Sequence, residues 1–549
     1  MLKQVMKEIV RELGNLLVGE ITTEADTRDF FSTDGSVFRV EPSLIIYPKN
    51  ESDVVITVKY LRDKADNGVY LPITARGKGT DQGGGALGTG AMLVFPAHMK
   101  RLVAIDKQTV TVQPGMIYSH LEGVLHSHGR FLPPYPASVD FATIGGAVAN
   151  NSAGEKTVKY GSTRNYVGAL RVVLSNGDVI TTYRLNKREL AKKKMQDDFE
   201  GHIYRAVDQM IESNKALIAK APPHVSKNSA GYDLWDVKHK NGSFDLSQLI
   251  VGSQGTLGIV TQATLTHEPF NTNTTLLAGF FDSIEKATAA VEKIMPLGPS
   301  ALEVVDYHLL DFLRKHKPEQ IEGLVPEQLP QIGLLIEFDD QKARVQAKKA
   351  RKVAKLFKKL AYDSRYATDP DEQDALWKIR RGAAAVIWMI NGPKKALPII
   401  EDGVVPLEKM PEFLESVYAL FRKYKLDIAV WGHAGDANFH LQPFMDLSNM
   451  RDRSKVFELM DDFYKLVIRM GGSTCGEHND GRLRAPYLKK LYGAEMYKLF
   501  EQVKEVFDPA KILNPGVKIG VTQQDIAVRL RHEYSMKHLH DFLPGVLRK

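Results

Sequence analysis

Three glycine-rich segments, each beside a short apolar stretch, constrain the fold of this chain more than any other feature. They cover residues 75–90, 132–167 and 251–265. Glycine accepts positive φ angles and lets a backbone approach a ligand closely, so these segments predict functional loops. Residues 44–48 and 71–75 predict strands, and Ser52 predicts the N-cap of a helix between them. This order of elements indicates an α+β or α/β fold and excludes a helix bundle.

The first glycine-rich segment reads ARGKGTDQGGGALGTG and follows the strand predicted at residues 71–75. Successive backbone N–H groups in such a loop can form a nest for anionic oxygens, which makes Arg76 to Thr80 a natural pyrophosphate cradle. The segment lacks the Gly-Lys-Ser/Thr of a Walker loop and the acidic residue expected about 20 positions after a dinucleotide fingerprint. Taken alone, it fits a plain loop equally well.

The length of 549 residues predicts two or three domains. Short strands are expected up to a hairpin at residues 170–182, whose Asn176-Gly177 turn is a strong signal. From about residue 272, strands alternate with the helices predicted at 284–294 and 340–360, which indicates a second domain with helices on one face of an antiparallel sheet. The stretch after Gly516 carries no ligand-like feature and is expected to be helical.

The charge and the cysteine content exclude several classes of protein. The net charge is +7 over the whole chain, a surplus too small to indicate a nucleic-acid partner. A single cysteine, Cys475, excludes intrachain disulfides and an iron–sulfur cluster ligated only by the chain's own thiolates. No apolar run suits a membrane span or a signal peptide, so a cytoplasmic location is expected, with room for peripheral contact at the inner face of a membrane.

Two runs of basic residues, at 187–194 and 342–359, could indicate a surface that binds a partner. The second alternates with apolar residues at helical spacing. A solvated helix face is the plain interpretation, and a face that docks on a membrane or a partner is the alternative.

A second group of candidate functional residues lies in the segments WGHAGDANFHLQPF (residues 431–444) and GGSTCGEHNDGRLRAPYL (residues 471–488). Two imidazoles, from His433 and His440, and the carboxylate of Glu477 could hold zinc, manganese or iron(II) and leave positions open for substrate. A structural pair of histidines is the alternative. His478 follows Glu477, and a neutral imidazole suits a general base near neutral pH.

In this order and at this spacing, the three glycine-rich segments resemble the FAD-binding domain of the vanillyl-alcohol-oxidase-like flavoproteins. More narrowly, the chain resembles the FAD-linked D-lactate dehydrogenase, glycolate oxidase and D-2-hydroxyglutarate dehydrogenase group from about Thr22 to Gly516. The resemblance implies a two-part FAD-binding domain of the PCMH type with an inserted antiparallel-sheet cap (substrate) domain. The implied boundaries are a helical region at 1–40, the FAD-binding domain at 41–270, the cap at 271–480, a segment at 481–516 that packs back on the FAD-binding domain, and a tail at 517–549.

The resemblance also implies which residues hold the cofactor. Residues 76–90 contain no histidine or cysteine that could tether FAD, so the FAD is expected to be noncovalent. The implied FAD contacts are Arg76, Gly77, Lys78, Gly79, Thr80, Asp81, Gln82, Pro136, Ser138, Thr143, Gly145, Gly146, Asn150, Ser152, Ala153, Gly255, Ile259 and Asn514.

For the chemistry, the resemblance implies a divalent metal held by His433, His440 and Glu477, with His478 as the base. Asn438 would pair with substrate. Arg380, with Arg381 as the alternative register, would grip the substrate carboxylate.

The chain departs from the family pattern at two places. After Glu477 and His478, Asn479-Asp480-Gly481 replaces the usual Gly-x-Gly, as in larger members fused to an iron–sulfur domain. Ala384 and Ile400 stand where glutarate-specific relatives have threonine and lysine, which favours a monocarboxylate.

The function expected from this resemblance is oxidation of a small D-2-hydroxy acid to the 2-keto acid by hydride transfer to flavin. D-lactate is the first choice, followed by glycolate or D-2-hydroxyglutarate. The electron acceptor would be a quinone, an electron-transfer flavoprotein or an iron–sulfur protein. An oxidase, an alkyl-ether-lipid-synthase-like flavoenzyme and a non-catalytic flavin-binding subunit of a redox complex are the alternatives.

Overall fold

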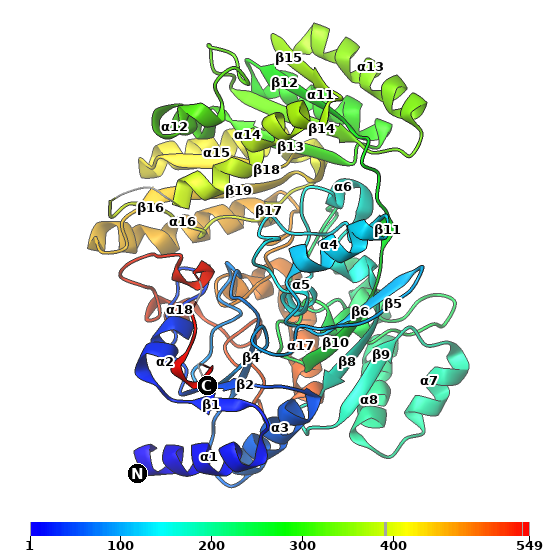
Figure 1. Ribbon diagram of the computed structural model, residues 1–549, viewed down its shortest axis with the longest axis vertical. Coiled ribbons are helices and arrows are strands. Elements are labelled where there is room, and N and C mark those ends of the chain that lie inside the picture. Colours follow the sequence, from blue (N-terminus) through cyan, green and yellow to red (C-terminus); the bar gives the residue numbers. More distant parts are fainter. Residues whose placement is uncertain (1, 389–391, 541, 548–549) are drawn as a thin grey trace.

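The computed structural model describes residues 2–388, 392–540 and 542–547, without the side chains of residues 2, 3 and 382–388. A four-stranded and a five-stranded sheet lie in the half of the molecule that holds the N-terminal third of the chain, and an eight-stranded sheet forms the other half (Figure 1). The short strands β7 (Arg130–Phe131) and β11 (Glu268–Pro269) form an additional two-stranded sheet. No described helix is long and apolar enough to cross a bilayer.

The first sheet has the order β1 (Glu20–Thr22), β2 (Leu44–Tyr47), β4 (Ala91–Val94), β3 (Ile73–Arg76). Strands β2, β4 and β3 are parallel, and β1 is antiparallel to β2. Helices α1 (Leu2–Leu16) and α3 (Glu51–Asp66) bury apolar residues against this sheet. The N-cap of α3 is Asn50, whose side chain accepts a hydrogen bond from the Asp53 N–H, so the prediction of Ser52 as N-cap is wrong by two residues.

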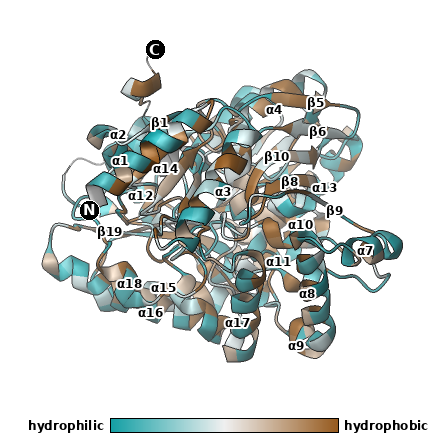
Figure 2. Cartoon of the chain, turned by 90° about the horizontal axis from the view of Figure 1, so that it is seen from below, coloured by the Kyte–Doolittle hydropathy of each residue, from teal (hydrophilic) through white to brown (hydrophobic). Residues whose placement is uncertain are grey.

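The second sheet is antiparallel, in the order β5 (Leu102–Ile105), β6 (Thr109–Val112), β10 (Ile259–Thr266), β8 (Val167–Val173), β9 (Val179–Tyr183). Its core is shared with α8 (Phe199–Ser213) and α17 (Leu488–Phe507). The basic run at 187–194 forms α7 (Lys187–Lys194), a hydrophilic helix at the periphery of the molecule (Figure 2).

The third sheet is antiparallel throughout. Its order is β15 (Asp363–Ala367), β12 (Thr275–Phe281), β14 (Ile332–Phe338), β13 (Ala301–Asp306), β18 (Ile428–His433), β19 (Asn438–Met445), β16 (Lys395–Ala396), with β17 (Gly403–Val404) beside β19.

Helices cover both faces of the third sheet, so the expectation of helices on one face is wrong. Helices α11 (Ile284–Ile294), α13 (Ala343–Leu360), α15 (Met410–Tyr424) and α16 (Met450–Arg469) pack on one face. Helices α12 (Tyr307–His316) and α14 (Pro370–Trp388) pack on the other. Every residue of β12, β13 and β14 is buried for this reason.

After α17 the chain returns to the first sheet, where Leu513 bridges Ile73. The described residues of the tail that follows form one short α-helix, α18 (Gln523–Ala527), and are otherwise irregular apart from isolated helical turns, so the expectation of a helical tail is wrong. Its backbone pairs with another loop instead: Arg39 N–H donates to the Arg529 carbonyl and Arg531 N–H to the Val37 carbonyl, both at 2.9 Å. The tail, red in Figure 1, therefore lies over residues 32–39.

Ion pairs connect the eight-stranded half to the second glycine-rich segment, residues 132–167. Lys156 pairs with Glu337, Lys159 with Asp339 and Arg381 with Glu155. The Lys156–Glu337 pair is buried, and Glu337 also accepts a hydrogen bond from Ser300 at 2.5 Å. These contacts fix the two halves on either side of the cavity described next.

Candidate functional site

A single cavity of about 1060 Å³ joins the glycine-rich loops to the histidine cluster of the eight-stranded half. This volume lies at the upper end of the range for cofactor and ligand sites. All but two of the residues expected to contact FAD line it, the exceptions being Ile259 and Asn514. Arg380, His433, His440, Glu477 and His478 line its other end.

The first glycine-rich loop forms a tight cradle at one end of this cavity. A Cβ atom on Gly77 would lie 2.3 Å from Thr143 Oγ1, so only glycine allows this approach of the loop to the second segment. Gly79 has a φ of +84°. The guanidinium of Arg76 is buried and donates to the carbonyls of Phe31, Thr33 and Ala86, so it braces the loop from behind. The size and the glycine cradle fit an extended dinucleotide.

Side chains of the three glycine-rich segments are joined by hydrogen bonds. Asp81 accepts from Asn150 Nδ2 at 2.8 Å, and Asn150 Oδ1 accepts from Gln254 Nε2 at 3.0 Å. Asn514 donates to the Gly85 and Gln254 carbonyls at 2.8 and 2.7 Å. Ile259 packs in the apolar core of the first sheet. Asn514 and Ile259 therefore support the loops from outside the cavity.

Three ligand atoms converge at the opposite end of the cavity. His433 Nε2 lies 3.4 Å from His440 Nε2, and Glu477 Oε1 lies 3.1 and 3.2 Å from these two nitrogens. All three residues are buried. Ligands bound to one ion at about 2.0–2.2 Å lie about 3–3.5 Å apart, so this donor set fits a divalent cation. The same spacing without an ion is consistent with a hydrogen-bonded cluster.

Each of the two histidines is oriented by a buried carboxylate on its other ring nitrogen. His433 Nδ1 lies 2.7 Å from Glu303 Oε1, and His440 Nδ1 lies 3.3 Å from Glu401 Oε2. A carboxylate behind a histidine fixes its tautomer and leaves Nε2 to face the site, as is usual in metal centres.

The electrostatics of the cluster keep Glu477 ionised. Burial raises the pKa of Glu477, but the ammonium group of Lys227, 2.7 Å from Glu477 Oε2, and His433 outweigh it and hold that pKa well below its usual range. Burial lowers the pKa of His440 to about 4. Burial also opposes protonation of His433, but Glu303 and Glu477 raise its pKa to about 8.

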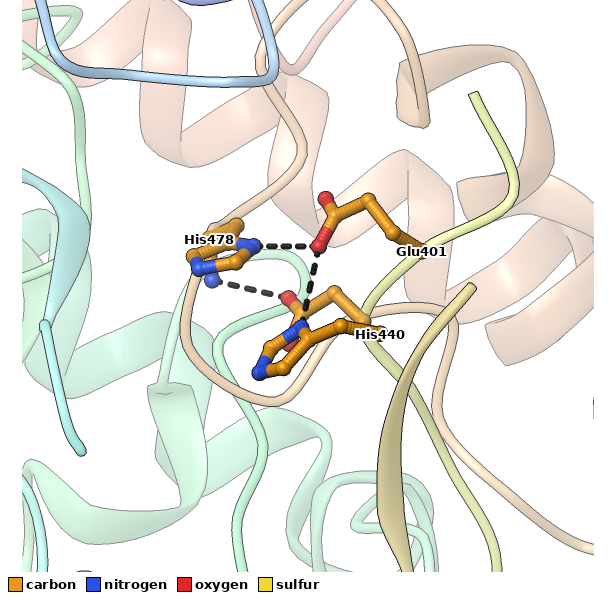
Figure 3. A group of neighbouring side chains, drawn as sticks. Glu401, His440 and His478 are labelled. Carbon is orange, nitrogen blue, oxygen red and sulfur yellow. Dashed lines mark hydrogen bonds and ion pairs between the residues drawn. The ribbon is translucent and has the colours of Figure 1, made fainter. Parts of the chain in front are cut away.

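His478 and His440 share one carboxylate, Glu401 (Figure 3). His478 Nδ1 is hydrogen-bonded to Glu401 Oε2, and Arg484 forms an ion pair with the other oxygen of Glu401. His478 Nε2 lies 3.7 Å from Glu477 Oε1, so it faces the cluster. If Nδ1 carries the proton donated to Glu401, Nε2 is free to accept one, which is the arrangement of a general base.

Arg380 and Arg381 both line the cavity but have different partners. Arg380 Nε donates to Glu303 Oε2 at 2.8 Å, and no described residue accepts from its two terminal amino groups. Arg381 is half exposed and pairs with Glu155. Of these two arginines, Arg380 is therefore the one whose terminal amino groups could donate hydrogen bonds to a substrate beside the histidine cluster.

Asn438 lies behind the cluster. It is fully buried, is absent from the cavity lining, and donates to Asp402 Oδ1 and to the Gly403 carbonyl, each at 3.2 Å. Asp402 in turn accepts from the backbone N–H groups of Glu477 and His478. The Nδ2 group of Asn438 therefore holds the turn that carries Glu477 and His478, while its Oδ1 has no hydrogen-bond partner among the described residues. The substrate contact expected for Asn438 stays a prediction.

Four further residues of the site, Glu303, Glu401, Asp402 and Lys227, are not among those expected from the sequence motifs. A signal existed for three of them: Glu303 interrupts the apolar strand ALEVVD, and Glu401-Asp402 interrupt the apolar run PIIEDGVV. Acidic residues are rarely fully buried without a partner, so a carboxylate in such a run indicates one. Nothing in the neighbourhood of Lys227 distinguishes it.

Comparison with known proteins identifies the class. Residues 42–183 match the family model for an FAD-binding domain, and residues 271–517 match that for the C-terminal domain of FAD-linked oxidases. Among solved structures, p-cresol methylhydroxylase has a TM-score of 0.69 at 15% identity, covering 94% of this chain and 97% of that one. An alkyldihydroxyacetonephosphate synthase has a TM-score of 0.61 at 16% identity, covering 93% and 84%. The predicted fold class, an FAD-binding domain of the PCMH type with an antiparallel-sheet cap, is confirmed.

The chain belongs to the family of FAD-linked oxidases. It is 30% identical to the glycolate oxidase subunit GlcD of Bacillus subtilis, over 86% of this chain and 88% of that protein. It is 28% identical to a D-lactate dehydrogenase of Archaeoglobus fulgidus, over 87% and 91%. It is 27% identical to a D-2-hydroxyglutarate dehydrogenase of Pseudomonas putida over 91% of this chain, and it spans only half the length of that relative.

Proposed function

We propose that this protein is an FAD-dependent dehydrogenase that oxidises a small D-2-hydroxy acid, D-lactate first, to the 2-keto acid. The observation that carries the proposal is the single cavity lined by both the glycine-rich cradle and the histidine cluster. Relatives named for D-lactate, glycolate and D-2-hydroxyglutarate support the class of substrate. Bound FAD would supply the acceptor for the hydride that leaves the α-carbon.

In this proposal the side chains of the chain itself bind the acid and take its proton. Arg380 would pair with the carboxylate through its terminal amino groups. His478 Nε2 would accept the hydroxyl proton, while Glu401 would stabilise the resulting imidazolium. A divalent ion on His433, His440 and Glu477, whether zinc, manganese or iron(II), would polarise the hydroxyl oxygen.

The arrangement of cations favours a monocarboxylate. Near the cluster, the described cationic side chains that line the cavity are Lys156, Arg380 and Arg381. Lys156 and Arg381 are engaged by Glu337 and Glu155, so among the described side chains a second substrate carboxylate has no open cationic partner there. Ile400, which stands where glutarate-specific relatives are expected to have a lysine, is buried in the apolar core. Ala384 stands where those relatives are expected to have a threonine, and its side chain is not among those described.

The proposal is tested by anaerobic absorbance spectra of the purified holoprotein during addition of D-lactate, L-lactate, glycolate and D-2-hydroxyglutarate. Bleaching of the visible flavin band by D-lactate is the expected result. A flavin band that none of the acids bleaches would overturn the proposed activity and favour an ether-lipid-synthase-like enzyme or a non-catalytic subunit. Slow reoxidation in air would separate a dehydrogenase from an oxidase.

Replacing Arg380 with lysine is expected to lower kcat/KM for the acid by about tenfold to a hundredfold, mainly through KM, because lysine cannot form the bidentate pair. Arg381→Lys is the matched comparison and should have the smaller effect, since Glu155 holds that residue at the rim. Steady-state kinetics of both variants check this. An equal or larger effect at position 381 would assign the carboxylate to Arg381 instead.

For the electron acceptor, we propose a quinone, an electron-transfer flavoprotein or an iron–sulfur protein, reached from a cytoplasmic location. Helix α13 supports contact with an anionic membrane surface or acidic partner, since it lies at the outer edge of the cap (Figure 1). Its buried apolar residues Ala350, Val353 and Phe357 face the sheet, whereas Val345 is exposed. Its exposed face carries Arg344, Lys348, Arg351, Lys352, Lys355, Lys358 and Lys359.

A further inference from the structure

The C-terminal tail carries one histidine into the cavity. His538 is 1% exposed and lines the same cavity as the cradle at residues 77–80. Neither of its ring nitrogens has a hydrogen-bond partner among the described residues. Buried polar atoms nearly always have a partner in folded proteins, so an imidazole with two unpartnered nitrogens at the edge of a cavity points to a ligand.

The position of His538 is fixed by contacts between the tail and the cradle. Arg531 donates to the Asp34 carbonyl at 2.6 Å, and the Tyr534 hydroxyl donates to the Gly35 carbonyl at 2.8 Å. Gly35 N–H in turn donates to the Gly79 carbonyl at 3.0 Å. The loop around Gly35 therefore lies between the tail and the first glycine-rich segment and contacts both. Through this loop, the position of the tail depends on the position of the cradle.

Three cations act on His538, and the carboxylate of Asp34 lies near two of them, Arg76 and Arg531. Burial and the positive charges of Arg76, Arg531 and Lys78 lower the pKa of His538 to about 3. The ring is therefore neutral, with one N–H donor and one acceptor nitrogen. A neutral donor among fixed positive charges suits an anionic oxygen, for which the cations supply the attraction and the N–H group supplies the direction.

We infer that His538 donates a hydrogen bond to the pyrophosphate of FAD, so that the tail is part of the cofactor site. The inference rests on the proposed function for the presence of FAD. It goes beyond the family match, because the matched domains end at residue 517. Together with the loop at residues 77–80, which lines the same cavity, the tail would form part of the pyrophosphate site.

The test uses the full chain freed of flavin and titrated with FAD, with riboflavin, and with ADP as a competitor. Flavin fluorescence reports the dissociation constants. For His538→Ala we expect the Kd of FAD to rise about tenfold to a hundredfold, the loss of one hydrogen bond to a charged group. The Kd of ADP should rise in parallel, and that of riboflavin, which lacks the pyrophosphate, should stay unchanged.

Three further variants make the result specific. His532→Ala removes an exposed histidine of the same tail and should leave every Kd unchanged. His538→Gln keeps an N–H donor and should recover part of the FAD affinity. His538→Phe fills the volume without a donor and should behave as His538→Ala, while thermal unfolding of the apoproteins checks that all variants fold.

Two outcomes would overturn the inference, and they differ. Variants at position 538 that fold and bind FAD and ADP as the native chain does would refute the role of His538 and leave the proposed function intact. A native apoprotein that binds no FAD at all would refute the proposed function together with this inference.

Discussion

His478→Ala is expected to keep the visible flavin spectrum and to lose about 10²–10⁴-fold in the rate of flavin reduction by the acid, the contribution typical of a general base. The reason is that His478 Nε2 faces the cluster while Nδ1 is held by Glu401. Stopped-flow absorbance under anaerobic conditions measures the rate.

His478→Gln is the control for this prediction. Glutamine can keep a hydrogen bond to Glu401 but cannot take up the proton, so it should be nearly as slow as alanine. His308→Ala, an exposed histidine of the eight-stranded half, should leave the rate unchanged. Flavin reduction by His478→Ala at the native rate would remove His478 from the mechanism.

Removal of the proposed divalent ion by a chelator is expected to lower the rate of flavin reduction at least about a hundredfold, because an ion at such a site would stabilise the developing alkoxide by several kcal/mol. Flavin content should not change, since the cradle lies at the other end of the cavity. Elemental analysis should find about one ion per chain, and re-addition of zinc, manganese or iron(II) should identify which one restores the rate.

His440→Ala and His433→Ala should bind far less than one ion per chain, and no added metal should restore their rates. Carboxylates that orient the ligand histidines also contribute to metal affinity. Glu303 is hydrogen-bonded to His433, so Glu303→Gln is expected to weaken metal binding about tenfold to a hundredfold. A native holoprotein without bound metal and indifferent to chelators would show that the cluster is purely hydrogen-bonded.

Much of the fold could be predicted from the sequence because its strands and helices carry strong local patterns. The helix at 284–294 and the hairpin around Asn176-Gly177 follow from periodicity and turn chemistry. The tail could not be predicted in this way. Its order comes from hydrogen bonds to residues distant in the chain, such as that between Arg531 and Val37, and no local pattern encodes those.

The site likewise combines residues that local sequence motifs identify with residues that only the tertiary structure brings into place. The motif segments identify His433, His440, Glu477 and His478, but their partners depend on tertiary register. Glu303 meets His433 only because β13 and β18 pair antiparallel with those two residues opposite each other. That pairing requires the strand order of the complete sheet, which sequence periodicity does not specify.

Glu401 has a mechanical consequence for the site. Because one carboxylate receives Nδ1 of both His440 and His478, the two rings are anchored at a common point and stack with their centroids 5.0 Å apart. The position of Glu401 therefore sets the positions of both rings and the spacing between His478 and the ligand cluster. In the proposed reaction, the proton would move within this one hydrogen-bonded unit of the eight-stranded half. The hydride, in contrast, would cross from that half to a flavin held by the glycine-rich loops.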